Sequence, residues 1–198
     1  MATQKKTPRL IAQLAWLAGL ALAAIAASHG SVVAYLEFNR SKILSGEWWR
    51  LLTSHLTHFD EWHLAANLAY LSILIYWSRH LALEGWLSYC AFATVVVPVA
   101  LLLEPDPLEY YRGISALLYG LTVWGSLALA ARGRRYLYLI PVGILIFIAI
   151  ELLGLTPVRY LAADAVVYPA AHLYAVLAAI FWHFLWRKVT HKIRRVST

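Results

Sequence analysis

Long apolar runs, separated by short charged or proline-containing breaks, fill most of this chain. A membrane core of about 30 Å is crossed by roughly 20 apolar helical residues, which is the length of these runs. Backbone polar groups in lipid must be satisfied within the segment, so each run is predicted to be a helix. The pattern therefore predicts an all-α membrane protein, with residues 1–198 forming one domain. Six spans are expected near residues 10–27, 59–78, 86–103, 113–131, 136–154 and 166–186.

Composition agrees with a membrane location. Hydrophobic residues make up 62% of the 198 residues and charged ones only 14%, against roughly 25% charged in a soluble domain. Nine Trp and twelve Tyr are residues that gather at membrane–water interfaces. Cys90 is the only cysteine, so it cannot form a disulfide within the chain. In the long first loop, residues 28–58, an amphipathic element at the bilayer surface is expected at Trp48, Trp49, Leu51 and Leu52.

The charges indicate how the spans are oriented. Basic clusters precede the first span, follow the second and fourth, and end the chain, whereas the opposite loops carry "EPDPLEYYR" and "PVRYLAAD". The positive-inside rule then places both termini in the cytoplasm. The net charge of +7 reflects orientation and contact with anionic lipids, and no nucleic-acid partner is expected. The clusters are Lys5, Lys6 and Arg9; Arg79 and His80; Arg132, Arg134 and Arg135; and Arg187, Lys188, Lys192, Arg194 and Arg195.

The first span also has features of a cleaved signal peptide, because basic residues precede it and "AAIAAS" supplies small residues. We interpret it as a retained span. Its removal would leave five spans and still no soluble domain to export.

Polar residues at membrane depth are costly, so each needs a partner or a purpose. Ser115, His172, His63 and Asn67 fall in the same leaflet on three predicted spans. A serine whose proton is accepted by a histidine is an activated nucleophile. His63 and Asn67, at spacing i, i+4, share a helix face and can donate hydrogen bonds to an oxyanion, as can the Ser115 N–H. Counted from the polar ends, His172 lies about four residues deeper than Ser115, so the two meet only if the loop "EYYRG" enters the membrane.

Other interpretations of these residues remain open at this point. A membrane serine often bonds its own backbone or allows close helix packing, and a histidine or asparagine often links helices. A zinc site would draw on the cluster His55, His58, Asp60, Glu61 and His63. However, "HFDEWH" departs from the H-E-x-x-H spacing that puts two ligands on one helix face. No metal and no other cofactor is therefore expected.

Three motifs together resemble those of the rhomboid family of intramembrane serine proteases, over a range from Trp49 to about Ala179. "WWRLLTSHLTHFDEWHLAANL" is similar to the Trp-Arg loop motif and the His-rich entry to the second span. "GISALLYG" is similar to the Gly-x-Ser-Gly nucleophile motif, and "AHLYAVLAA" to the His-x2-Gly-x3-Gly pattern of the last span. Ala116, Ala175 and Ala179 stand where the family has glycine, and these small-for-small changes are expected to preserve packing at slightly larger spacing.

The resemblance implies a six-helix rhomboid-like bundle and a role for each matching residue. Ser115 would be the nucleophile and His172 the general base, with His63 and Asn67 stabilising the oxyanion. The supporting positions would be Gly113, which permits tight approach, Tyr119 packed on the base, the loop histidine His58, the structural pair Trp49 and Arg50, and the small residues Ala175 and Ala179.

Within the family, "GEWWRLLTSHLTH" and "YRGISALLYG" look most like the rhombosortase branch. That resemblance implies a bacterial inner-membrane protein whose site faces the periplasm. Its substrates would be transmembrane proteins with a Gly-Gly-containing C-terminal sorting tail, cleaved with hydrolysis or with transfer to an amine-bearing, lipid-like acceptor. Two alternatives belong to other classes: a non-catalytic rhomboid-like protein that binds transmembrane clients, and a zinc-dependent intramembrane hydrolase.

Overall fold

The computed structural model describes residues 7–78, 81–105, 108–155 and 168–196, and it is mainly helical. The predicted basic residues Lys5, Lys6, Arg79 and His80 and the loop "PVRYLAAD" lie outside these ranges. The elements in chain order are α1 (Thr7–Ala27), α2 (Gly30–Leu36), β1 (Phe38–Asn39), α3 (Arg40–Leu44), α4 (Arg50–Thr53), α5 (Glu61–Ser78), α6 (Leu83–Leu102), β2 (Tyr110–Tyr111), α7 (Ser115–Ala130), η1 (Arg135–Tyr138), α8 (Leu139–Leu152) and α9 (Pro169–Val196).

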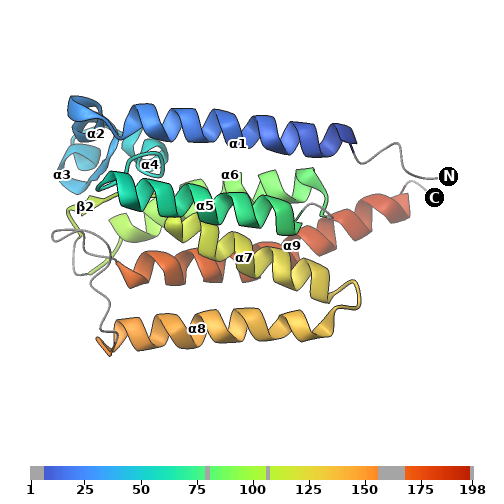
Figure 1. Cartoon of the computed structure of the whole chain (residues 1–198). Coiled ribbons are helices and arrows are strands. Elements are labelled where there is room, and N and C mark those ends of the chain that lie inside the picture. The colour runs from blue at the N-terminus through green and yellow to red at the C-terminus, as the bar shows by residue number, and fades with distance from the viewer. Residues whose placement is uncertain (1–6, 79–80, 106–107, 156–167, 197–198) are drawn as a thin grey trace.

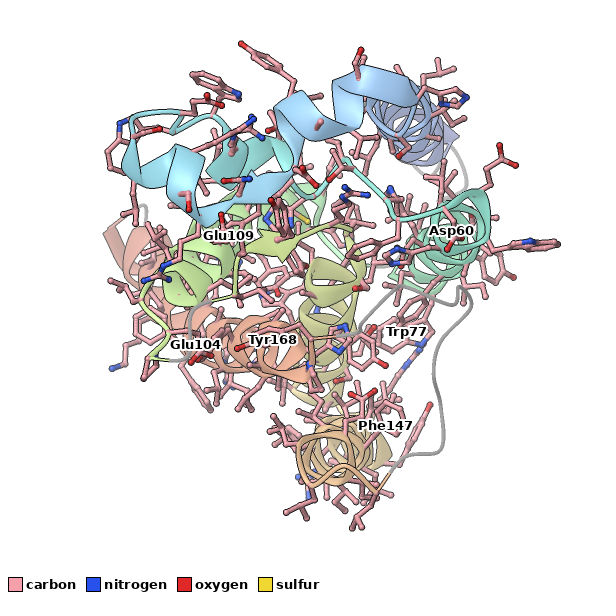
Figure 2. The ribbon with its side chains drawn as sticks, turned by 90° about the vertical axis from the view of Figure 1, so that its left-hand side faces the viewer. Asp60, Trp77, Glu104, Glu109, Phe147 and Tyr168 are labelled. Atoms are coloured by element: carbon pink, nitrogen blue, oxygen red, sulfur yellow. The ribbon has the colours of Figure 1, made fainter. Side chains whose placement is uncertain are left out.

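The long helices run side by side, and α7 is the central one (Figure 1). It packs against α5, α6, α8 and α9, most extensively against α9. Eleven of its sixteen residues are buried, as expected of a helix that is apolar on all sides and enclosed by others. Seen from the end that carries α2 and α3, α8 lies at the edge of the bundle (Figure 2). The core is therefore built around α7, whose first residue is Ser115.

Small residues let α7 and α9 approach closely. A Cβ atom on Gly120 would lie 2.5 Å from the Ala175 carbonyl oxygen and would overlap the Tyr89 hydroxyl. That hydroxyl donates a hydrogen bond to the same carbonyl (3.1 Å). Ala175 and Ala179 are fully buried on the facing side of α9. Close backbone approach fixes the relative height of the two helices, and with it the heights of Ser115 and His172.

The end layer, which we define as residues 28–60 and 108–114, covers one end of the bundle. The predicted long loop folds into three short helices and a two-residue strand that pairs antiparallel with β2, Phe38 opposite Tyr111. Arg112 forms an ion pair with the buried Glu37 (2.6 Å), which ties the two halves of the layer together. This layer brings residues distant in sequence next to the start of α7.

The proposed surface element in this layer is only partly exposed. Trp48, Trp49 and Leu52 are exposed, whereas Leu51 is half-buried and packs against the core. Trp49 also donates its indole N–H to the Tyr35 carbonyl (3.2 Å).

Each of the six predicted spans contains a helix, and the bounds are similar except that α9 continues beyond residue 186 to Val196. Fewer helices meet a length and hydropathy criterion for crossing a membrane. Within the described residues, three do so: Leu83–Leu102, Arg135–Leu152 and Pro169–Thr190. A pair bent by 101°, Ala18–Ala27 with Gly30–Leu36, would make four. The helix α7 is apolar but has only 16 residues. The helix α5 is less apolar, because it carries Glu61, His63 and Asn67 in its first half. Six spans remain a prediction.

Candidate functional site

Ser115 and His172 meet near the end layer. Ser115 is the first residue of α7 and His172 lies in the first turn of α9. Their side chains approach to 3.2 Å, measured from Ser115 Oγ to His172 Nε2. The helix α7 begins further into the bundle than α5 does (Figure 1), which removes the difference in depth expected from the sequence. The structure thus provides the geometry in which the serine can donate its proton to the imidazole.

Tyr119 fixes the orientation of the histidine ring. It lies one turn after Ser115 in α7, and its ring stacks on the His172 ring at 4.3 Å with an angle of 10° between the planes. Tyr70 of α5 contacts Tyr119 edge-on (6.4 Å). Because this stacking fixes the plane of the His172 ring, its two nitrogens are held in fixed directions, with Nε2 toward the serine.

His63 and Asn67 lie beside the loop that leads into Ser115. A Cβ atom on Gly113 would lie 2.8 Å from His63 Cε1 and 3.7 Å from Asn67 Nδ2. Gly113 has φ +112°, a conformation that other residues rarely adopt. The amide nitrogen of Asn67 is buried and has no hydrogen-bond partner within the described part of the chain. It is therefore free to donate to a ligand oxygen.

The loop before Ser115 is anchored from both sides. The Gly113 N–H donates to the Ser54 carbonyl (3.1 Å), and the Tyr111 hydroxyl donates to the Gly113 carbonyl (3.0 Å). Burial raises the pKa of Tyr111 above its ordinary value of 10, so it remains a protonated donor. These bonds hold Gly113 in its unusual conformation.

His58 packs edge-on against His63, with ring centroids 5.0 Å apart. Its Nδ1 lies 3.1 Å from the Leu56 carbonyl and 3.3 Å from Ser28 Oγ, so Nδ1 carries the proton. Burial and the neighbouring His63 lower the pKa of His58 from 6.5 to about 4. It is therefore neutral near pH 7, and the Leu56 carbonyl fixes its ring beside His63.

Trp49 and Arg50 support the end layer and do not touch the Ser115–His172 pair. Arg50 is almost fully buried and donates to the carbonyls of Ala34 (2.9 Å) and Glu37 (3.0 Å) as well as to the Glu47 carboxylate (2.6 Å). One guanidinium thus ties α4 to the end of α2.

The residues considered for zinc make other contacts. His55 Nε2 points to the Thr94 carbonyl (3.2 Å) on α6, whereas Asp60 Oδ1 accepts a hydrogen bond from the His63 backbone N–H (2.7 Å). In the residues that the structure describes, no group of three or more His, Cys, Asp and Glu side chains is placed to hold a metal.

Glu151 is a neighbour of the pair that the sequence analysis overlooked. Its carboxylate oxygen Oε2 lies 3.7 Å from His172 Nδ1, on the side of the ring away from Ser115. The available signal was a single acidic residue in the apolar run "GILIFIAIELLG", because an ionisable residue at membrane depth is a candidate functional residue by default.

The fold and the site define a helical membrane protein with a serine–histidine pair between two packed helices. The model of the Rhomboid domain matches residues 45–189, and the chain belongs to this family. The match includes Ser115, His172 and Glu151 as well as His63 and Asn67, and it begins after α3. Rhomboid domains form helical membrane bundles and are typically intramembrane serine proteases. No curated protein sequence matches the chain at a significant level.

Proposed function

We propose that this protein is an intramembrane serine endopeptidase in which Ser115 is the nucleophile and His172 the general base. The observation that carries the proposal is the 3.2 Å approach of Ser115 Oγ to His172 Nε2, within a chain of the Rhomboid domain family. An oxygen and a neutral ring nitrogen at this separation are in position for proton transfer.

The proposed reaction begins when Ser115 Oγ attacks a substrate carbonyl carbon and its proton passes to His172 Nε2. The carbonyl oxygen becomes an oxyanion, to which Asn67 Nδ2, His63 and the Ser115 N–H donate hydrogen bonds. Collapse of this intermediate breaks the C–N bond, and His172 returns the proton to the departing amine. Water, or an amine acceptor, then attacks the acyl-enzyme with His172 again as base.

The Ser115 N–H contributes because of its position. It belongs to the first turn of α7, where backbone N–H groups have no intrahelical partner and the helix dipole favours negative charge. Preorganised donors of this kind are typically worth about 3 to 4 kcal/mol each in the transition state.

We further propose six membrane spans, with both termini in the cytoplasm and the site facing the periplasm of a bacterial inner membrane. The described ends of α1 and α9 lie at the end of the bundle opposite the end layer (Figure 1). The connection between α7 and α8 lies at that same end, and it contains the basic residues Arg132, Arg134 and Arg135. The positive-inside rule supports this orientation.

Transmembrane proteins are the general substrates implied by the family. The finer proposal, a rhombosortase-like cleavage of Gly-Gly-containing C-terminal sorting tails, rests on the sequence motifs alone. Glycine weakens a helix, so it favours exposure of the backbone carbonyl that the serine must reach. Mass spectrometry of the new C-terminus of a co-expressed tail-bearing protein tests this. A free carboxylate indicates hydrolysis, an added amine indicates transfer, and an intact tail contradicts the proposed specificity.

The activity itself is tested with a fluorophosphonate probe on the purified protein. We expect wild type to label and Ser115→Ala to lose labelling completely, because the probe reacts with the activated hydroxyl. Ser126→Ala is the matched control, since Ser126 lies on the same helix and donates to its own backbone at Val123 (2.8 Å). Equal labelling of wild type and Ser115→Ala would refute the proposal. Client capture without any labelling would favour the non-catalytic alternative.

A further inference from the structure

Glu151 is a carboxylate placed in an apolar setting. It lies near the end of α8, one turn after Phe147, which is labelled in Figure 2. Its side chain is 3% exposed, although most of α8 is apolar and lies at the edge of the bundle. Burying a carboxylate is costly unless it is paired or hydrogen-bonded. An acidic residue in this position therefore needs a specific partner.

The partner that the geometry offers is the base of the proposed protease. Glu151 Oε2 lies 3.7 Å from His172 Nδ1. Neither atom has a hydrogen-bond partner among the residues that the structure describes. A single hydrogen bond between them would satisfy both buried groups. The separation is a few tenths of an ångström beyond hydrogen-bond reach, and the flexible glutamate side chain can cross it.

The proton that His172 must carry shows which atom donates in its contact with Glu151. To accept the serine proton at Nε2, neutral His172 must carry its own proton at Nδ1. That N–H is a donor, and the Glu151 carboxylate is an acceptor. Tyr119, stacked on the ring at 4.3 Å, keeps the two nitrogens directed at Ser115 and Glu151.

We propose that Glu151 is a positioning residue of the Ser115–His172 pair, accepting a hydrogen bond from His172 Nδ1 and stabilising the imidazolium that forms during attack. The serine proton moves to Nε2, the Nδ1 proton stays on the ring, and Glu151 remains unprotonated throughout. This inference rests on the proposed protease function and extends it from two residues to three. The logic is that of a serine–histidine–carboxylate triad, here with the carboxylate supplied by α8.

Among the residues that the structure describes, those that interact with the His172 ring come from three helices. Ser115 and Tyr119 lie on α7 and Glu151 on α8. From α5, His63 is close enough to interact electrostatically with His172. A change in pH dependence must therefore be read against a control that leaves these groups intact.

A second carboxylate near α9 provides that control. Glu104, which follows α6, accepts a hydrogen bond from the Tyr174 hydroxyl two residues after His172. The variant Glu104→Gln removes a negative charge close to α9 without touching the imidazole.

The experiment measures the rate of fluorophosphonate labelling across pH for wild type, Glu151→Gln, Glu151→Asp and Glu104→Gln. We expect Glu151→Gln to lower the plateau rate by about tenfold or more, because the imidazolium loses its counter-charge. We also expect the acid limb of the pH–rate profile, where the rate falls as the pH drops, to move to lower pH in Glu151→Gln. The reason is that the imidazolium has lost its counter-charge. Glu151→Asp should keep the acid limb near its wild-type position but with a reduced plateau. Glu104→Gln should match wild type in both respects.

A purely structural role would reduce the amount of folded protein without moving the acid limb. A Glu151→Gln protein that folds with the wild-type rate and pH profile overturns the inference while leaving the protease proposal intact. If Glu151→Gln does not fold, Glu151→Asp decides, and an unchanged plateau rate in that variant overturns the inference. If wild type itself does not label, the protease proposal is refuted, and the proposed role of Glu151 is refuted with it.

Discussion

Gly113 satisfies two requirements that other residues meet poorly. Its φ of +112° disfavours any side chain, and a Cβ atom there would press on His63. The residue therefore controls how closely the loop before Ser115 approaches the proposed oxyanion donors. A shift of about 1 Å in such a constellation can cost about 100-fold in rate.

We expect Gly113→Ala to lower the labelling rate by roughly 100-fold, because His63 and the loop must separate. Gly133→Ala is a matched control: Gly133 also has positive φ (+103°), but nothing lies within 4 Å of an added Cβ. It should lose about 1 kcal/mol of stability from the backbone alone and keep its labelling rate. Similar labelling rates in the two variants would contradict the role given to Gly113.

At the scale of elements, the contact between α7 and α9 sets the distance between the serine and the histidine. Gly120 lies where α7 meets the Ala175 carbonyl and the Tyr89 hydroxyl. Ala175 and Ala179 of α9, which stand where the family has glycine, are fully buried. Alanine in place of the family's glycines is therefore compatible with a 3.2 Å approach of the two site residues.

We expect Gly120→Ala to destabilise the protein by about 1 to 3 kcal/mol, since the helices must move apart to admit the methyl group. Gly143→Ala in α8 adds the same methyl group where nothing lies within 4 Å, and it should be neutral or stabilising by up to about 1 kcal/mol. Thermal unfolding of both variants in detergent measures the difference. Equal stabilities would mean that the α7–α9 contact tolerates an extra methyl group.

At the scale of the whole molecule, the end layer holds two histidines neutral. Burial lowers the pKa of His55 to about 4, partly offset by hydrogen bonds to the backbone, and His58 has a similar value. Unfolding restores the ordinary value near 6.5. The unfolded chain then binds more protons, so acid favours unfolding.

We expect stability to be fully retained above pH 6.5 and to fall progressively as the pH drops toward 4. Thermal unfolding measured between pH 6.5 and 5 reports mainly the contribution of the histidines, because most carboxylates titrate at lower pH. His58→Asn should reduce the slope, whereas His29→Asn, which changes an exposed histidine, controls for the loss of a histidine elsewhere. A slope that His58→Asn leaves unchanged would show that His58 does not contribute.

The sequence by itself determined the helical segments and indicated candidate site residues. Apolar length forces helices, and Ser115, His172, His63 and Asn67 are candidates because polar groups at membrane depth are costly. The folding of residues 28–58 into short helices and a strand pair was not predicted, because these segments are stabilised by contacts such as Arg50 with distant carbonyls.

Only the tertiary structure decided which helix faces meet. Periodicity shows which residues share a face, but the rotation and depth of each helix depend on packing against its neighbours. The contact at Gly120 and the inward start of α7 bring Ser115 level with His172. The same packing turns Glu151 toward the other ring nitrogen, a relation that no spacing along the chain encodes.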